Sequence, residues 1–271
     1  MSWHDTDSEV ARTVPPTVST VDVLGVPVSA INMDMALDTL GRWIAEATPA
    51  YVCVTGVHGV MESQRDPVLL QIHQEAGLVT PDGMPLVWLC RKRGQRAVER
   101  VYGPDLLLRV CERSLRTGWS HYFYGGAEGV AVELARHLSE MFPGLKIAGT
   151  HCPPFRPLTE EEDADVMREI AASGADIVWV GLSTPKQERW MSTHVGRVGA
   201  PVLIGVGAAF DFHSGRKRQA PTWMQRNGLE WLYRMLQEPR RLGPRYLRHN
   251  PAFVAQLLFG GRTSSHASRD A

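Results

Sequence analysis

The sequence is poor in cysteine and has no long hydrophobic run. Its 271 residues include four cysteines, Cys53, Cys90, Cys111 and Cys152, which lie far apart and form no CxxC pair. Most of them stand in apolar segments, which predicts reduced thiols in the core of a cytoplasmic protein. No stretch approaches the roughly 20 apolar residues that a membrane-spanning helix needs. The acidic N-terminal residues lack an apolar segment, so we expect no secretory signal peptide.

Motifs of three well-known chemistries are also absent. The ten histidines form no HxxxH and no mixed His/Cys spacing, which gives no support for a metal site. The glycine-rich stretches hold neither a Walker lysine motif nor a complete GxGxxG, which disfavours an NTPase and an NAD-dependent oxidoreductase. Asp163 and Asp165 have the DxD spacing of metal-dependent sugar transferases, but the run EEEDAD (160–165) is typical of the acidic first turn of a helix. We therefore expect no metal and no cofactor.

Charge is balanced in total but not along the chain. Lys plus Arg and Asp plus Glu each number 29, so the formal net charge is zero. Residues 216–248 nevertheless carry nine Lys/Arg against two Glu, a net charge of +7. Such asymmetry predicts a basic surface for an anionic partner. Both ends of the chain are polar and lack periodicity, and we expect disordered tails at 1–19 and 260–271.

Short apolar runs alternate with helix-like segments through most of the chain. A hairpin or edge strand is expected at 21–29, and strand-like runs follow at 51–55, 76–80, 121–126, 145–150, 175–182 and 200–212. Asn32, and Thr159 together with Glu162, are predicted helix caps. This order predicts an α/β, Rossmann-like, mainly parallel sheet with helices on both faces. The predicted core spans 20–215, and a basic, amphipathic, helical, membrane-associating appendage spans 216–259.

The ends of the predicted strands mark the expected active site. In an open parallel sheet, ligands bind at the carboxyl ends of the strands. The residues that follow the predicted strands are Thr55 and His58, Asp82 and Gly83, Gly125 and Gly126, Ser183 to Glu188, and Gly205 to Asp211. We expect the functional side chains among them.

Asp82 stands in a Pro-Asp-Gly corner between two apolar runs. An aspartate in a turn commonly bonds its own backbone, and Pro-Asp-Gly is a frequent turn sequence. At the end of a strand, however, a partly desolvated carboxylate can act as a general base. The residues alone leave both interpretations open.

Two further segments carry groups suited to a phosphate. In GLSTPKQERW (181–190), Ser183 or Thr184 is predicted to cap a helix opened by Pro185. Free backbone N–H groups there, with Lys186 and Gln187, would suit a phosphate, and a plain helix start with exposed Lys and Glu is the alternative. In ERVYGPDLL (99–107), Arg100 could hold a diphosphate in bidentate fashion or stand as a solvated surface group.

Six blocks together resemble the WecG/TagA/CpsF family of bacterial glycosyltransferases, over about Val21 to Phe253. They are TPDGMPLVW, ERVYGPDLL, YFYGG, GADIVWVGLSTPKQERWM, IGVGAAFDFHSG and APTWMQRNGLEWLYRMLQEPRRLGPRYLRHNP. Each block is weak by itself, whereas their order and spacing are specific.

The resemblance implies a metal-independent, inverting transfer from a UDP-sugar to a polyprenyl-diphosphate-linked saccharide in cell-surface polysaccharide synthesis. In the teichoic acid branch the donor is UDP-N-acetylmannosamine and the acceptor is undecaprenyl-diphosphate-N-acetylglucosamine. Other branches move N-acetylmannosaminuronic acid or glucose. The expected partners are therefore a UDP-sugar, a polyprenyl-diphosphate-linked acceptor and an anionic membrane surface, with no nucleic acid.

The resemblance also suggests roles for individual residues. The family's presumed catalytic aspartate falls on Asp82, its strand-end threonine on Thr55 and its arginine on Arg100. Its Pro-Lys-Gln-Glu falls on Pro185 to Glu188. The residues predicted to bind the donor and its diphosphate come from this motif and from the ends of other strands: they are Ser183, Lys186, Gln187, Glu188, Gly125, Gly126 and Gly205. Many relatives have Thr-x-Asn after the first core strand, whereas this chain has Val57 at the asparagine position. His58, which follows, is either a substrate contact, a second proton carrier or an ordinary helix-start histidine.

The basic appendage gains a role from the same resemblance. Its apolar residues interleave with arginines as in an interfacial amphipathic helix, which predicts a peripheral position on the inner face of the plasma membrane. Arg234, Arg241 and Arg245 are candidates to reach a diphosphate or the membrane. The alternative is a helical pair docked on the core with solvated arginines.

Two other functions remain to be weighed against glycosyl transfer. One is a catalytically inactive regulator or scaffold that binds a nucleotide sugar, which intact Asp82, Thr55, Arg100 and Gln187 argue against. The other is an oxidoreductase that binds NAD, which the missing fingerprint disfavours. The sequence leaves open which sugar is moved and whether the chain forms a homo-oligomer.

Overall fold

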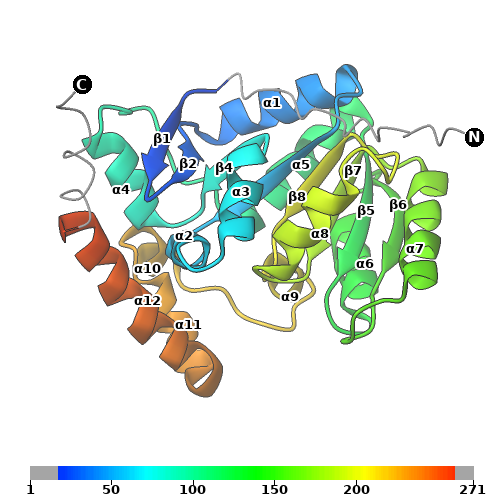
Figure 1. Ribbon diagram of the computed structural model, residues 1–271. Coiled ribbons are helices and arrows are strands. Elements are labelled where there is room, and N and C mark those ends of the chain that lie inside the picture. The colour runs from blue at the N-terminus through cyan, green and yellow to red at the C-terminus, as the bar shows by residue number, and fades with distance from the viewer. Residues whose placement is uncertain (1–17, 260–271) are drawn as a thin grey trace, which may run out of the picture.

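A six-stranded parallel sheet forms the centre of the protein. The structure, a computed structural model, describes residues 18–259 (Figure 1); the predicted tails lie almost wholly outside them. The strands are β3 (Ala50–Thr55), β4 (Leu78–Pro81), β5 (Ser120–Gly125), β6 (Lys146–His151), β7 (Ile177–Gly181) and β8 (Val202–Gly205). Their order is β4-β3-β8-β7-β5-β6, and every neighbouring pair is parallel. The predicted parallel α/β fold is confirmed.

A separate hairpin precedes the sheet. Strands β1 (Thr20–Val23) and β2 (Val26–Ser29) pair antiparallel. The turn between them places Leu24 and Gly25 at positive φ, 55° and 83°. Glycine adopts this conformation without steric cost, which favours the turn. The hairpin expected at 21–29 is therefore present.

Helices cover both faces of the sheet, as predicted. One apolar cluster joins one face of the sheet to α1 (Met33–Ala45), α5 (Gly103–Thr117), α6 (Val130–Met141) and α9 (Ala209–His213). The other joins the opposite face to the hairpin and to α2 (Val57–Ser63), α3 (Pro67–Glu75), α4 (Met84–Lys92), α7 (Glu160–Ser173) and α8 (Lys186–His194). Side chains alternate between the faces of a strand, so Tyr51 and Cys53 enter one cluster and Val52 the other. Burial of such a side chain contributes about 1.5–3 kcal/mol.

Local signals set several element boundaries. The Asn32 side chain accepts a hydrogen bond from the Met35 amide at 3.0 Å, and Thr159 and Glu162 form both bonds of a capping box. The expected strand at 200–212 is wrong in its second half: β8 ends at Gly205 and α9 follows from Ala209. Gly207, at a φ of 49°, turns the chain between them, so the apolar residues after the strand belong to a helix that packs on the sheet, where Phe210 contacts Phe123.

Three helices form the appendage after the last strand. They are α10 (Thr222–Arg226), α11 (Glu230–Gln237) and α12 (Pro239–Phe259), and α12 lies along α2 (Figure 1). Leu242 and Phe253 of α12 are buried. The appendage is thus docked on the core through apolar contacts. Among the described helices, none combines the length and the apolar character needed to cross a membrane.

Candidate active site

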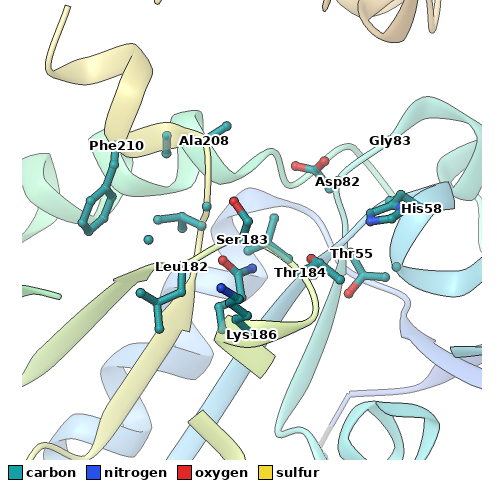
Figure 2. Close-up of a pocket in the computed structure, with 18 of the residues that line it drawn as sticks. Thr55, His58, Asp82, Gly83, Leu182, Ser183, Thr184, Lys186, Ala208 and Phe210 are labelled. Carbon is teal, nitrogen blue, oxygen red and sulfur yellow. The ribbon is translucent and has the colours of Figure 1, made fainter. Parts of the chain in front are cut away.

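A large cavity lies at the carboxyl ends of the core strands. Its volume is about 1670 Å³, which exceeds the roughly 300–1,000 Å³ of a typical small-molecule pocket. Gly56, Asp82, Gly126, Leu182 and Val206 border it, and each follows the end of a different strand. The appendage closes it on another side. The cavity lies at the edge of the sheet that the sequence predicted, and Thr55, Asp82 and Lys186 are among the side chains that line it (Figure 2).

Asp82 presents a carboxylate to this cavity. Its amide donates to the Thr55 carbonyl at 3.1 Å, and its Oδ1 accepts from the Gly103 amide at 3.1 Å. Within residues 18–259, no donor hydrogen-bonds Oδ2, which lies beside Gly56. The side chain therefore bonds the start of α5, 21 residues away, and not its own turn. Burial raises the pKa of Asp82, and the charge of Arg100 partly offsets this, so the carboxylate is a stronger base than an exposed aspartate.

Arg100 is engaged on several sides. Its Nε donates to the Asp82 carbonyl, its Nη1 donates to Gln225 Oε1 at 3.2 Å, and its Nη2 pairs with Glu230. The guanidinium lies 3.8 Å from the centre of the Tyr102 ring, and the Tyr102 hydroxyl donates to Glu230 Oε1 at 2.8 Å. The alternative of a solvated surface arginine is therefore wrong. Contact with a diphosphate would require this arginine to exchange Glu230 for the ligand.

Thr55 ends β3 at the floor of the cavity. Its hydroxyl lies 3.0 Å from His73 Nε2, and His73 Nδ1 lies 2.9 Å from the Leu69 carbonyl. Burial lowers the pKa of His73, which keeps the imidazole neutral. Because Nδ1 must then donate to the carbonyl, Nε2 can accept from Thr55, whose hydroxyl also lies 3.3 Å from the Cys53 carbonyl oxygen. The threonine hydroxyl proton is thus held away from the cavity, and its oxygen lone pairs remain to accept a bond.

The start of α8 differs from the predicted cap. Pro185 is the N-cap residue, and neither Ser183 nor Thr184 caps the helix through its side chain. Ser183 has a φ of 64°, and the Thr184 hydroxyl donates to Glu188 Oε1 at 2.8 Å. The left-handed turn at Ser183 directs the chain into the helix, and the threonine is used to bind a buried carboxyl group. The predicted cap is therefore wrong.

The residues predicted to bind the donor separate into two groups. Ser183, Lys186, Gln187, Arg100 and Gly126 border the cavity, whereas Glu188, Gly125 and Gly205 do not. Gln187 and Glu188 are both buried, and in the described chain Gln187 Oε1 and Glu188 Oε2 have no hydrogen-bond partner. Burial raises the pKa of Glu188. Glu188 accepts a hydrogen bond from the Thr184 hydroxyl in the loop before α8.

Packing accounts for the two glycines outside the cavity. A Cβ on Gly125, whose φ is 123°, would lie 2.7 Å from the Gly181 carbonyl carbon. A Cβ on Gly205 would lie 2.7 Å from Met191 Cε and 3.0 Å from Gln187 Nε2. Gly125 requires glycine, because its φ is positive and the added Cβ would meet the backbone of β7. At Gly205 the added Cβ would meet only the ends of two side chains of α8, which can move aside.

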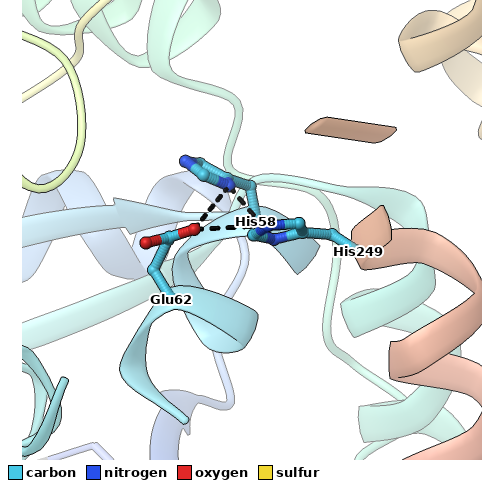
Figure 3. Close-up of side chains that lie close together, drawn as sticks. All are labelled: His58, Glu62 and His249. Atoms are coloured by element: carbon cyan, nitrogen blue, oxygen red, sulfur yellow. Dashed lines mark hydrogen bonds and ion pairs between the residues drawn. The ribbon is translucent and has the colours of Figure 1, made fainter. Parts of the chain in front are cut away.

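His58 lies at the start of α2 and borders the cavity. Its Nδ1 is 3.4 Å from His249 Nδ1 and 3.9 Å from Glu62 Oε1 (Figure 3). No ligand spacing in the sequence reveals the group of His58, Glu62 and His249, because His249 comes from the distant helix α12. His58 is therefore not an isolated helix-start histidine.

The appendage supplies cations and an acid to the cavity. Arg234 borders it with its guanidinium 5.7 Å from the Phe212 ring, and Arg241 borders it while paired with Glu238. The side chain of Arg245 lies outside the described residues. Glu230 was not predicted from the sequence, because an acidic residue in a basic helix carries no local sign of a distant partner.

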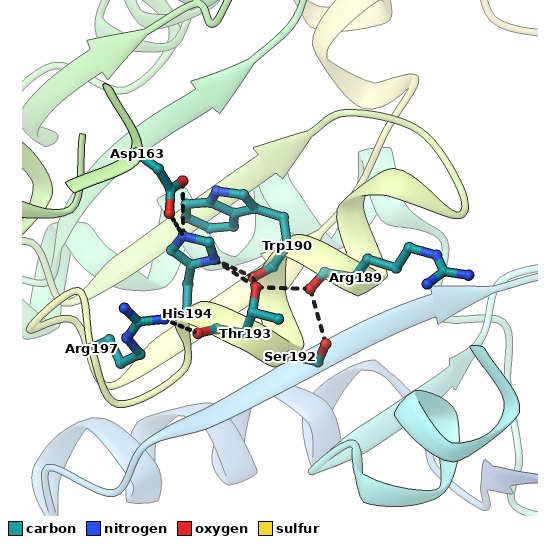
Figure 4. A network of polar contacts seen from close by, with 7 residues as sticks. All are labelled: Asp163, Arg189, Trp190, Ser192, Thr193, His194 and Arg197. Atoms are coloured by element: carbon teal, nitrogen blue, oxygen red, sulfur yellow. Dashed lines mark hydrogen bonds and ion pairs between the residues drawn. The ribbon is translucent and has the colours of Figure 1, made fainter. Parts of the chain in front are cut away.

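Asp163 and Asp165 are both bound by protein partners. Asp163 pairs with His194 Nε2 at 3.0 Å, and His194 Nδ1 lies 2.7 Å from the Trp190 carbonyl oxygen (Figure 4). Asp165 pairs with Arg168. The two carboxylates stand in the first turns of α7, as the acidic-run interpretation predicted, and they diverge to separate partners.

Aromatic residues beside the cavity were also missed by sequence reasoning. Tyr124 stacks on Trp190 with ring centroids 4.4 Å apart, and both border the cavity. Phe155, in the loop after β6, borders it too and is 88% exposed. Applying the strand-end rule to β6 would have directed attention to this loop. Tyr124 and Trp190 are buried, and His194 stacks on Trp190 with ring centroids 4.2 Å apart, so these rings form part of the cavity wall.

Similarity to known proteins agrees with this architecture. The sequence profile described as the glycosyl transferase WecG/TagA/CpsF family matches residues 21–267. A Bacillus spizizenii protein named N-acetylglucosaminyldiphosphoundecaprenol N-acetyl-beta-D-mannosaminyltransferase is 29% identical over 204 residues, 75% of this chain and 77% of the relative. A Staphylococcus aureus protein of the same name is 25% identical over 240 residues, 88% of this chain and 91% of the relative. The chain therefore belongs to the glycosyl transferase WecG/TagA/CpsF family of enzymes.

Proposed function

We propose that the protein transfers a sugar from a UDP-sugar to a polyprenyl-diphosphate-linked saccharide, with inversion, in the synthesis of a bacterial cell-surface polymer. N-acetylmannosamine, its uronic acid and glucose are the proposed donor sugars. Family membership supports glycosyl transfer, and the names of both relatives contain a diphosphoundecaprenol acceptor and an N-acetylmannosaminyl group. The size of the cavity supports simultaneous binding of both substrates.

The observation that carries the proposal is the Asp82 Oδ2 atom, which accepts no hydrogen bond from the residues that the structure describes. A sugar hydroxyl is a poor nucleophile until a base takes its proton. In our proposal Asp82 Oδ2 takes this proton as the acceptor oxygen bonds to the anomeric carbon of the donor. The bond from that carbon to the diphosphate breaks in the same displacement, which inverts the configuration.

Charge on the leaving UDP is balanced by cations in this proposal, without a metal. Lys186 borders the cavity from the core, and Arg234 and Arg241 border it from the appendage. Such fixed cations stabilise charge that develops in the transition state. Arg100 can join them if the diphosphate displaces Glu230. Thr55 is proposed to orient the substrate beside Asp82 through its oxygen lone pairs.

The proposed position on the inner face of the plasma membrane follows from the appendage. Val254, Leu258 and Phe259 are exposed near the end of α12, the helix that also carries Arg240 and Arg248. Apolar side chains with basic neighbours favour an anionic membrane surface. This position would bring the cavity to a lipid-linked acceptor.

The decisive experiment offers several UDP-sugars to the full-length protein with a lipid-linked N-acetylglucosamine acceptor, and products are identified by mass. Transfer from one donor, with an inverted anomeric centre by NMR and a turnover that added Mg²⁺ or Mn²⁺ does not raise, is the expected result. Binding of UDP-sugars without transfer from any of them would instead support an inactive binding protein.

A further inference from the structure

Two helices far apart in the sequence bring three potential metal ligands together. His58 and Glu62 lie one turn apart on α2, and His249 faces them from α12 (Figure 3). Glu62 Oε1 is 3.2 Å from His249 Nε2 and 3.9 Å from His58 Nδ1. One ligand atom from each residue can be chosen so that all three lie within 4.8 Å of one another. His249 is buried, and the other two side chains are partly exposed.

The spacing of these atoms suits a small divalent ion. Zn²⁺ binds imidazole nitrogen and carboxylate oxygen at about 2.0–2.2 Å in a tetrahedron, whose ligand atoms are therefore about 3.3–3.6 Å apart. The contacts of 3.2, 3.4 and 3.9 Å among the three residues use both nitrogens of His249, and with one atom from each residue the separations stay within 4.8 Å, so the side chains must close around an ion. His249 presents Nδ1 to His58 and Nε2 to Glu62, so the rings must turn slightly to direct one nitrogen each to a common point.

The types of ligand select among the metals. Two imidazoles and one carboxylate match the His₂Glu sets of zinc sites, in which a fourth position is left for water or substrate. Mg²⁺ and Ca²⁺ prefer oxygen ligands, of which this group offers one side chain. Zn²⁺, or Co²⁺ in its place, is therefore the ion that this group fits.

We propose that His58, Glu62 and His249 bind one Zn²⁺ ion that fastens α12 to α2 beside the cavity. The ion would connect the core to the appendage, since its ligands come from both. This role is separate from the proposed sugar transfer, in which no step passes through a metal. Without the ion the three side chains would still form a hydrogen-bonded group, and that is the alternative to be tested.

The first test is a titration of the metal-free, full-length protein with Co²⁺, followed by visible absorption. We expect one Co²⁺ per chain, bound more tightly than about 10 µM, intense bands of a low-coordinate site, and full displacement by Zn²⁺. Absence of saturable binding in this range would overturn the proposal.

Variants locate the ion. His249→Gln, Glu62→Gln and His58→Gln should each weaken binding by more than the roughly 10–100-fold lost with an outer partner of a ligand. His151→Gln is the matched control, because His151 forms a His–Glu pair with Glu169 at 3.1 Å and has no place in the group. Equal affinity in wild type and all three variants would show binding elsewhere on the surface and overturn the proposal. Should buried His249 prove essential for folding, His58→Gln and Glu62→Gln decide alone.

The fastening role has its own measurement. Hydrogen exchange of α12 amides should slow when Zn²⁺ is added to the wild type and stay unchanged in Glu62→Gln, because a bound ion stabilises only the docked state. Identical exchange of α12 with and without Zn²⁺ in a wild type that binds the ion would refute fastening.

Discussion

Glu230 of α11 forms an ion pair with Arg100, which in turn donates to the backbone carbonyl of Asp82. The two paired side chains are only 15% and 13% exposed. The pair joins the appendage to the core next to the predicted base. Any movement of the appendage must therefore change the environment of Asp82.

Glu230→Gln should destabilise the protein by about 1–3 kcal/mol, because it leaves a largely buried guanidinium without its counter-charge. Urea denaturation gives the free energy of unfolding. Glu140→Gln is the control, since the Glu140–Arg136 pair on α6 is exposed and should contribute less than about 0.5 kcal/mol. If the two substitutions lowered the free energy of unfolding equally, the Arg100–Glu230 pair would contribute no more to stability than an exposed ion pair.

Asp82→Asn should lower turnover roughly 100-fold or more, because the amide cannot take a proton from the acceptor hydroxyl. Binding of UDP-sugar and the melting temperature should stay close to wild type, since asparagine keeps the shape and the bond from Gly103. Asp105→Asn is the control: burial also raises the pKa of Asp105, and Arg100 acts on it too, but it does not border the cavity. Near-normal turnover in Asp82→Asn would remove Asp82 from the mechanism.

The acidic limb of the pH profile should respond to Arg100. Burial and Glu230 raise the pKa of Asp82, while Arg100 and Arg234 lower it, and kcat/KM falls as pH drops through that pKa because the base becomes protonated. Arg100→Gln removes a positive charge, so the pKa rises further and the limb moves to higher pH. Arg100→Lys keeps the charge and should move it less. If the acidic limbs of the pH profiles of wild type, Arg100→Gln and Arg100→Lys superimposed, Asp82 would not be the titrating base.

Gly125→Ala should destabilise the protein by roughly 2 kcal/mol or more. The new Cβ would meet the Gly181 backbone at 2.7 Å and occupy a φ of 123°, so overpacking adds to backbone strain. Gly144→Ala separates the two causes, because Gly144 has a φ of 93° with no atom within 4 Å of the added Cβ. A melting temperature of Gly125→Ala no lower than that of Gly144→Ala would show that β5 and β7 can separate at little cost.

Binding to anionic vesicles should depend on the exposed arginines of α12. Each basic residue near such a surface contributes roughly 1 kcal/mol, so Arg240→Gln with Arg248→Gln should weaken co-sedimentation roughly 10–30-fold. The control is Arg168→Gln with Arg197→Gln, which changes the net charge equally. Arg168 lies in α7 and Arg197 follows α8, so both residues belong to the core. Equal loss in the two double variants would mean that net charge, and not α12, controls membrane binding.

The sequence by itself predicted the features that depend on local pattern. Alternating apolar runs and helix caps such as Asn32 and Thr159 specify the elements, and the parallel order of the strands follows from the helices between them. The same order brought Asp82 and Thr55 to one edge of the sheet. These inferences succeed because the periodicity of side chains and the ends of parallel strands are properties of neighbouring residues.

Tertiary structure alone decided the contacts between the core and the appendage. Arg100 and Glu230 are 130 positions apart, and His58 and His249 are 191 apart, so no local pattern links either pair. The predicted cap at the start of α8 was wrong for a related reason. The Thr184 hydroxyl donates to Glu188, whose carboxyl group needs a partner because folding buries it. The packing of α11 and α12 on the core determines which groups meet between the core and the appendage. Burial makes an unpaired charge costly, so the groups that are buried there must find partners.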